Sequence, residues 1–262
     1  MRAVRLHEPG GIEGLSLDEI DVPEPGPGDV LVRVHAAAIT RDELEWPTDR
    51  LPAIPSAEVS GVVAKGVGGL EEGDEVFALS GFDRDGAAAE YTLVRAEYLA
   101  RKPANLSHVE AAALPMPGLT AWEALFDKGR LQAGERVLVI GASGGVGHVG
   151  VQLARWKGAE LVEDGPADVI FDTSGGEKLR QAPAQLAADG RLVSVAEEPP
   201  EGSGIYFVVG PNGAQLAEIA RLAEEGELKP EIDSTFPLDQ AREAFERVEH
   251  RGKHGKVVLT CD

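Results

Sequence analysis

The chain has 262 residues, of which 43% are hydrophobic and 27% are charged, and its formal net charge at pH 7 is −20. This is the composition of a globular protein, and its negative charge argues against nucleic acid and anionic membrane as partners, because both require a basic surface. No apolar run could span a bilayer, no signal peptide is recognisable, and a lone cysteine, Cys261, excludes internal disulfides and a cysteine-based zinc site. We therefore expect a cytoplasmic protein that binds no metal.

The first hundred residues are rich in glycine and proline and contain short β-like runs. Turn clusters such as 23–29 and 70–74 separate these runs. Short strands with regular turn signals predict a small barrel or sandwich. The predicted strands cover residues 3–7, 29–39, 59–65, 74–79 and 89–95.

The pattern changes at Ser107, where helices and buried strands begin to alternate. Ser107 is followed three residues later by Glu110, which predicts a capping box at the start of a helix. The segment Pro115–Gly118 predicts a break before a second helix. The continuous apolar run 136–141 is typical of a strand buried in a parallel sheet.

The remaining chain repeats this alternation. Helices are predicted at 146–157, 212–228 and 237–250, with another, broken by Pro183, before residue 191; strands are predicted at 168–172, 191–196, 204–210 and 255–261. A β-rich first part followed by α/β alternation predicts two domains.

A glycine-rich loop lies directly between a predicted strand and a predicted helix. Gly141, Gly144 and Gly147 form the pattern G-x-x-G-x-x-G. Glycines permit a tight turn and let backbone N–H groups approach a pyrophosphate, while the helix N-terminus adds a positive dipole end. The loop therefore predicts a dinucleotide site, although a turn that only packs a helix on a sheet has the same pattern.

Two stretches, "AAALPMPGLTAWEALF" (111–126) and "GERVLVIGASGGVG" (134–147), resemble the signature pair of the medium-chain dehydrogenase/reductase superfamily. The match is closest to its zinc-independent quinone oxidoreductase branch and extends over almost the whole chain. The resemblance implies an α/β fold: a GroES-like β-barrel catalytic domain at 1–106 and 236–262, and a shortened Rossmann-like domain with a doubly wound parallel sheet at 107–235. Such proteins bind NADPH in the cleft between the domains and transfer hydride to quinones or α,β-unsaturated carbonyls.

The resemblance and the strand ends together predict the site residues, because open α/β sheets bind ligands at the carboxyl ends of their strands. Thr40 stands where the branch commonly has Asn, the acid Asp42 follows two residues later, and Thr120 matches a position near the nicotinamide. These three are the catalytic candidates, although Asp42 would also fit a solvated surface and Thr120 a helix-packing hydroxyl. The predicted cofactor-binding residues are Gly141, Ser143, Gly144, Gly145 and Val146 for the pyrophosphate, Thr173 and Ser174 after the next strand, and Val195 and Ala196 on the nicotinamide side.

The chain departs from the family after the glycine loop. Only ten residues, 158–167, precede the strand at Asp168, whereas one parallel crossover alone takes about a dozen residues or more. We therefore expect that a strand at 160–164 cannot lead directly to a parallel strand, since three linking residues reach at most ~11 Å. The missing part normally holds the adenosine ribose. Glu163 and Asp164 have the usual offset of a ribose-binding acid, but they also fit a solvated turn.

Three functions remain open from the sequence. The intact glycine loop favours a reductase that uses NADPH or NADH, with a weakened adenosine site, on a small-molecule substrate. The missing ribose-binding unit favours a cyclase, lyase or isomerase that uses no cofactor and works with acids such as Asp42 and Glu43. A non-catalytic dimer that senses a small molecule is the third. The run 204–210 resembles an edge strand through which relatives dimerise, so we expect a homodimer.

Overall fold

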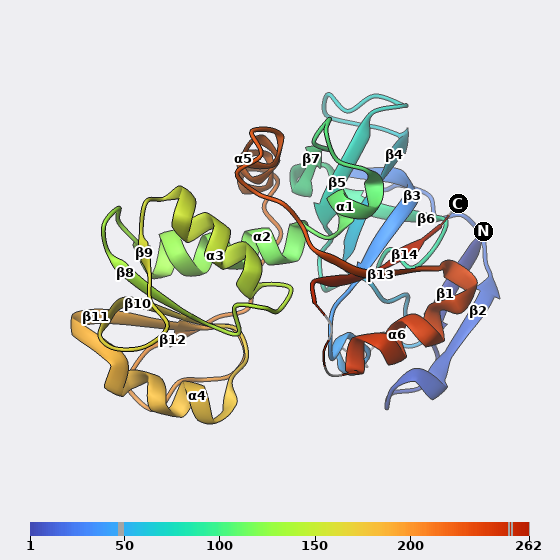
Figure 1. The fold of residues 1–262 in the computed structure, drawn as a ribbon. Coiled ribbons are helices and arrows are strands. Elements are labelled where there is room, and N and C mark those ends of the chain that lie inside the picture. The colour runs from blue at the N-terminus through green and yellow to red at the C-terminus, as the bar shows by residue number, and fades with distance from the viewer. Residues whose placement is uncertain (47–49, 251, 253, 262) are drawn as a thin grey trace. The chain divides into compact units, whose positions relative to one another are not determined.

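The computed structural model describes residues 1–46, 50–250, 252 and 254–261. The chain divides into two compact units (Figure 1). Unit 1 comprises residues 1–115, 210–224 and 230–262, and unit 2 comprises residues 116–209 and 225–229. The chain therefore enters unit 2 twice, once for residues 116–209 and again for residues 225–229, before it ends in unit 1. In the described part of the chain, no helix is both long and apolar enough to cross a bilayer.

Unit 1 is organised around the long strand β3 (Asp29–Ile39). β3 pairs with β4 on one side and with β6 and β14 on the other, all antiparallel. The sheet order is β13-β14-β3-β4-β5-β7, and β1 and β2 form a separate antiparallel pair. The strands are β1 (Arg2–Leu6), β2 (Leu15–Glu19), β4 (Glu58–Lys65), β5 (Glu75–Leu79), β6 (Tyr91–Arg95), β7 (Leu99–Arg101), β13 (Ile232–Pro237) and β14 (Lys256–Thr260).

A register shift in β3 between Val34 and Ala36 divides its buried residues between two packed clusters. Val34 and Ala37 belong to the large apolar core of the barrel, whereas Ala36 and Ala38 contact helix α1 (His108–Ala112) together with Val258 of β14. Alanines at these positions let the helix pack directly against the sheet. α1 begins with the predicted capping box.

Two further helices of unit 1 come from the second half of the chain. α5 (Gly213–Glu224), which we had expected in the second domain, contacts β7, and α6 (Ala241–Glu249) packs on β13 and β14. Short helical turns connect the other elements: η1 (Ile12–Gly14), η2 (Glu43–Glu45), η4 (Ala96–Tyr98) and η7 (Leu238–Gln240).

The predicted break at Pro115–Gly118 is wrong. Helix α2 runs from Pro115 to Trp122, and the interruption lies earlier, at Ala113 and Leu114. Proline at the first helical position costs the helix no hydrogen bond, because an N–H group at that position has no acceptor inside the helix. A π-helical turn, η5 (Glu123–Lys128), continues the segment.

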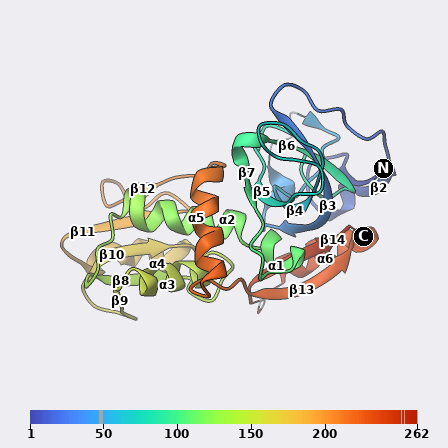
Figure 2. The same cartoon turned by 90° about the horizontal axis from the view of Figure 1, so that it is seen from above.

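Unit 2 is a five-stranded parallel sheet in the order β12-β11-β10-β8-β9. Helices α3 and α4 lie on its opposite faces (Figures 1 and 2). Gly150 of α3 lies against the ring of Phe171, whereas Leu179 of α4 packs with Ile140 and Ile170 on the other face. The elements are β8 (Arg136–Ile140), α3 (Gly147–Trp156), β9 (Glu160–Leu161), β10 (Ala167–Asp172), α4 (Gly176–Gln181), η6 (Ala182–Gln185), β11 (Leu186–Ser194) and β12 (Ile205–Tyr206).

The connection from β9 to β10 corrects a second expectation. Both strands are parallel to β8, and they lie on opposite sides of it. The expectation failed because β9 has two residues rather than five. The chain therefore travels only a short way along β8 before it must turn back to begin β10. The five residues 162–166 reach about 16 Å, more than the ~10 Å needed to pass one strand. No crossover helix occupies this fully described link.

Two glycines fix the shape of the loop between β8 and α3. Gly141 has φ +85°, a conformation that favours glycine. A Cβ on Gly147 would overlap the carbonyl oxygen of Gly141 and lie 2.9 Å from the Cα of Ala142. The first turn of α3 is therefore pressed against the loop backbone, as the third glycine of this pattern allows.

We expect Gly147→Ala to lower the free energy of unfolding by about 1–3 kcal/mol, because the added methyl group has no space. Urea denaturation measures the change. Gly144→Ala is the matched control, since a Cβ there meets only the Gly141 oxygen, at 3.3 Å. Equal stability of the two variants would contradict this packing.

Candidate functional site

The predicted cofactor residues of unit 2 gather where β8, β10 and β11 end. Thr173 follows β10, and its hydroxyl donates hydrogen bonds to the carbonyl oxygens of Ile140, at 2.9 Å, and Gly141, at 3.3 Å. Val195 follows β11, and its N–H donates a hydrogen bond to the backbone carbonyl oxygen of Asp172. Because the strands are parallel, segments distant in sequence form one edge of the sheet, as expected for a ligand site.

Asp172 organises this edge from inside. Its carboxylate is fully buried and accepts hydrogen bonds from the N–H groups of Ser174 and Gly175 and from the hydroxyl of Ser194. The last of these bonds joins the ends of β10 and β11. Asp172 therefore holds the turn that presents Thr173 and Ser174, a role that the sequence analysis did not identify.

The glycine loop presents backbone donors. Ser143 and Gly144 are exposed, and the N–H of Gly144 is used within the loop by the carbonyl of Gly141. Among the described residues, the N–H groups of Ser143, Gly145 and Val146 have no protein acceptor. Unpaired amides before the first turn of a helix are what a diphosphate requires, so these residues fit the pyrophosphate of a dinucleotide.

The adenosine side of such a site is reduced. β9 pairs only with Arg136 and Val137, so it ends three residues before β8 reaches the glycine loop. Glu163 and Asp164 follow it in an exposed bend. Residues 158–167 contain neither Lys nor Arg that could pair with a 2′-phosphate.

Unit 1 contains a buried polar cluster at the end of β3. Val257 of β14 is opposite Ile39, which places Lys256 opposite Thr40, while Glu58 at the start of β4 is opposite Ala38. The Lys256 ammonium contacts the Glu58 carboxylate and donates a hydrogen bond to the Thr40 hydroxyl at 2.9 Å. Glu58 is fully buried and Lys256 nearly so.

Glu43 joins this cluster from η2. Its two carboxylate oxygens accept hydrogen bonds from the N–H groups of Thr40 and Ala57, each at 2.9 Å. Burial raises the pKa of Glu43 to about 7, and the Glu58 carboxylate also raises it, whereas the Thr40 amide and the Lys256 charge lower it. The Glu43 carboxyl group therefore exchanges its proton near neutral pH.

The three catalytic candidates have different surroundings. Thr40 is half-buried within the cluster. Asp42 is exposed, with φ +62°, so the buried acid of this segment is its neighbour Glu43. Thr120 is buried in α2, in unit 2. In the sequence, Glu43 stands among several neighbouring acids and Lys256 has no assigned role, although a lysine that starts a buried strand is an unusual signal.

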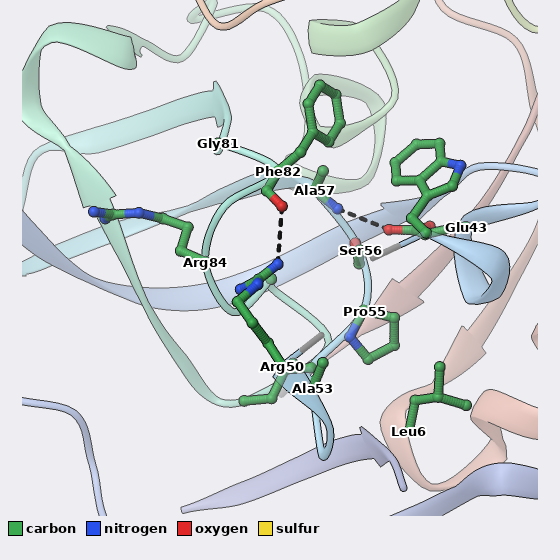
Figure 3. A pocket seen from close by; sticks show the side chains of 13 residues that line it. Leu6, Glu43, Arg50, Ala53, Pro55, Ser56, Ala57, Gly81, Phe82 and Arg84 are labelled. Atoms are coloured by element: carbon green, nitrogen blue, oxygen red, sulfur yellow. Dashed lines mark hydrogen bonds between the residues drawn. The ribbon is translucent and has the colours of Figure 1, made fainter. Parts of the chain in front are cut away.

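A pocket of unit 1 adjoins the cluster (Figure 3). Glu43 is one of its lining residues, and the rings of Trp46 and Phe82, which also line it, pack edge to face at 5.2 Å. Arg50 donates a hydrogen bond to the carbonyl oxygen of Phe82 on the same wall. The remaining lining residues are Leu6, Ala53, Ile54, Pro55, Ser56, Ala57, Gly81, Arg84 and Gly86. The lining is therefore mixed, because apolar side chains, the Glu43 carboxyl group and the guanidinium groups of Arg50 and Arg84 all contribute to it.

We expect Lys256→Met to lower the free energy of unfolding by about 3–5 kcal/mol, because it leaves a buried carboxylate without its cation. Urea denaturation of Lys256→Met and of the double variant Lys256→Met/Glu58→Gln checks this, since the second change removes the unpaired charge and restores most of the loss. Arg101→Met, which breaks an exposed pair with Asp74, is the control and has a smaller effect. A stable Lys256→Met protein would show that the buried pair does not constrain the fold.

Family models match two parts of the chain. Residues 26–104 match the alcohol dehydrogenase GroES-like domain, and residues 152–259 match the zinc-binding dehydrogenase family. A zinc ion does not fit the residues found here: Glu58 already contacts the Lys256 ammonium, and the described residues contain no group of three or more His, Cys, Asp and Glu that could hold a metal.

Known proteins resemble the chain over nearly its full length. It is 34% identical to 2-methylene-furan-3-one reductase of Solanum lycopersicum, over 99% of the chain and 79% of that protein. It is 30% identical to the quinone oxidoreductase of Rattus norvegicus, over 99% of the chain and 97% of that protein. The solved structure of the quinone oxidoreductase from Coxiella burnetii superposes with a TM-score of 0.89 at 25% identity, over 100% of the chain and 99% of that structure. The two sequence alignments span 310 and 322 positions, so both relatives contain residues that this chain lacks.

Proposed function

Since the chain belongs to the medium-chain dehydrogenase/reductase superfamily, in its quinone oxidoreductase branch, we propose that it is an NAD(P)H-dependent reductase of quinones or α,β-unsaturated carbonyls. The observation that carries the proposal is the glycine loop, whose amides of Ser143, Gly145 and Val146 stand unpaired beside the ends of β10 and β11. The named relatives are a reductase and an oxidoreductase, which favours this function over the cyclase, lyase or isomerase considered from the sequence.

In this proposal each unit has its own task. The loop residues Gly141–Val146 hold the diphosphate, and Thr173, Ser174, Val195 and Ala196 line the nicotinamide side. The bound nicotinamide supplies the hydride. In unit 1 the hydroxyl of Thr40 accepts a hydrogen bond from Lys256 and donates a long one, of 3.4 Å, to the Glu58 carboxylate; in this proposal that hydrogen turns to the acceptor oxygen as negative charge develops there. Lys256 acts through Thr40 and is therefore a positioning residue.

We also propose a homodimer in the cytoplasm. β12 is the last strand of its sheet, and Ile205, Tyr206 and Val208 around it are exposed. Pairing of this edge with that of a second copy would cover the apolar side chains and the unpaired backbone.

The loop is tested with Gly144→Asp. Because a Cβ there has only the Gly141 oxygen nearby, the fold tolerates the change, while the new carboxylate repels the diphosphate. We expect NADH and NADPH affinity, measured by fluorescence titration, to fall at least 30-fold, or about 2 kcal/mol.

Gly210→Asp is the matched control, because it adds the same charge at an exposed glycine with open space around it. The proposed loop site is excluded if Gly144→Asp binds either dinucleotide as tightly as this control does.

The reduced adenosine side gives a second test. Since β9 ends early and residues 158–167 carry no basic side chain, we expect NADH and NADPH to bind within about fivefold of each other, a difference of ~1 kcal/mol. Reduced nicotinamide mononucleotide, which lacks adenosine, should bind within about tenfold of both. Calorimetry with the three ligands measures these ratios, and a hundredfold preference for NADPH would reveal a 2′-phosphate site elsewhere.

A further inference from the structure

The glycine loop of unit 2 contains one peptide that its own residues restrain little. The peptide between Gly144 and Gly145 is flanked by two glycines, so its plane can turn over at small cost, because neither residue carries a Cβ. In one orientation the Gly145 N–H faces outward and can donate to a diphosphate. In the other orientation the Gly144 carbonyl oxygen faces outward and repels the diphosphate. The loop therefore needs a contact that selects the first orientation.

His148 makes that contact from the first turn of α3. Its backbone N–H nitrogen and its ring Nδ1 each lie 3.1 Å from the Gly144 carbonyl oxygen. A carbonyl oxygen only accepts hydrogen bonds, so Nδ1 carries a hydrogen and donates it. His148 is buried, and a hydrogen bond in such surroundings is stronger than one in water. Two donors of one residue thus hold the Gly144 oxygen toward the helix.

The direction of the Gly145 N–H follows from the planarity of the peptide. The Gly144–Gly145 peptide is trans, and a trans peptide points its C=O and its N–H in opposite directions. With the oxygen turned toward α3, the Gly145 N–H points out beyond the N-terminal end of the helix. No residue in the described part of the chain accepts a hydrogen bond from it there.

We propose that His148 is a positioning residue for the cofactor: its imidazole holds the Gly144 carbonyl toward α3 and so keeps the Gly145 N–H directed at the diphosphate before the dinucleotide arrives. This rests on the proposed function. All three residues belong to unit 2, so the arrangement does not depend on unit 1. A loop that is already set in its binding orientation loses less conformational freedom on binding, which raises its affinity for the ligand.

A role of His148 in helix stability alone predicts a different result. No side chain caps α3 at Val146, so the ring would then serve the helix by occupying the Gly144 oxygen. Such a role changes the free energy of unfolding and leaves the cofactor affinity of the folded protein unchanged. The backbone N–H of residue 148 bonds to the same oxygen whatever its side chain, so the helix keeps this hydrogen bond in every variant.

Three replacements of His148 separate these roles. Asn places its amide nitrogen where Nδ1 stands, Gln places it where Nε2 stands, and Leu has no donor. We expect His148→Leu and His148→Gln to weaken NADH binding about tenfold, which one hydrogen bond can account for, and His148→Asn to stay within about threefold of wild type. Calorimetry measures the affinities, and urea denaturation measures the stability of each variant.

Gln152→Leu is the matched control. Gln152 lies one turn further along α3, and its side chain donates hydrogen bonds to the carbonyl oxygens of His148, at 3.3 Å, and Lys229, at 3.0 Å. The change therefore removes side-chain hydrogen bonds from the same helix and leaves the Gly144 oxygen with both of its donors. We expect the NADH affinity of this variant to stay within about threefold of wild type.

Nuclear magnetic resonance observes the peptide directly. The chain contains four Gly–Gly pairs, at 10–11, 68–69, 144–145 and 175–176. Protein labelled with carbon-13 and nitrogen-15 in glycine alone therefore gives four carbonyl–amide correlations, and Gly144→Ala removes the one of interest and so assigns it. We expect NADH to shift this amide proton downfield, because the N–H gains an acceptor. We expect His148→Leu without cofactor to shift the carbonyl carbon upfield, because the oxygen loses a donor.

The outcomes separate the two proposals. If wild type binds neither NADH nor NADPH, the proposed function fails and this inference fails with it. If wild type binds NADH and Gly144→Asp weakens that binding, but folded His148→Leu binds as tightly as wild type, the loop holds the diphosphate and His148 does not position it. A Gly145 amide that does not respond to NADH, or a His148→Gln protein that binds NADH more tightly than His148→Asn does, also overturns the inference.

Discussion

The contact between the ammonium of Lys256 and the carboxylate of Glu58 is the constraint on which the candidate site of unit 1 depends. A charge taken out of water is tolerated only with a partner, so the first residue of β14 must meet the first residue of β4 across the end of β3. That requirement fixes the register of β14, which begins almost 200 residues after the start of β4. It also places a cation beside Thr40, and the helical turn that follows then brings Glu43 to the same place.

Much of the fold could be predicted from local pattern. The strand at 29–39, the capping box at Ser107 and the strand–loop–helix at the glycine loop were all found where the sequence placed them, because each depends on neighbouring residues. The family and its GroES-like and Rossmann-like parts are confirmed by the comparisons. Proline was misleading at 115, since the same residue that breaks a helix also begins one.

The candidate site could be predicted only in part, and the reason is distance along the chain. Loop residues such as Ser143 and Gly144 can be recognised from the spacing of the glycines in the loop. The roles of Asp172, Glu58 and Lys256 depend on partners far away in the chain, so the sequence alone does not show which groups these buried charges pair with. Among the acids at 42–45, the backbone of a short helical turn decides which one points inward, and no periodicity in three residues could have separated Glu43 from Asp42.

The two-residue strand β9 shows how a strand of a parallel sheet can be shortened without a change in the direction of any strand. Because β9 pairs only with the beginning of β8, five residues suffice to carry the chain to the far side of β8, and every strand keeps the same direction as its neighbours. The link from β9 to β10 thus contains no helix, and the strand order does not depend on one there. Residues 162–166 therefore cross β8 without a helix, while the carboxyl ends of β8, β10 and β11 still share one edge of the sheet.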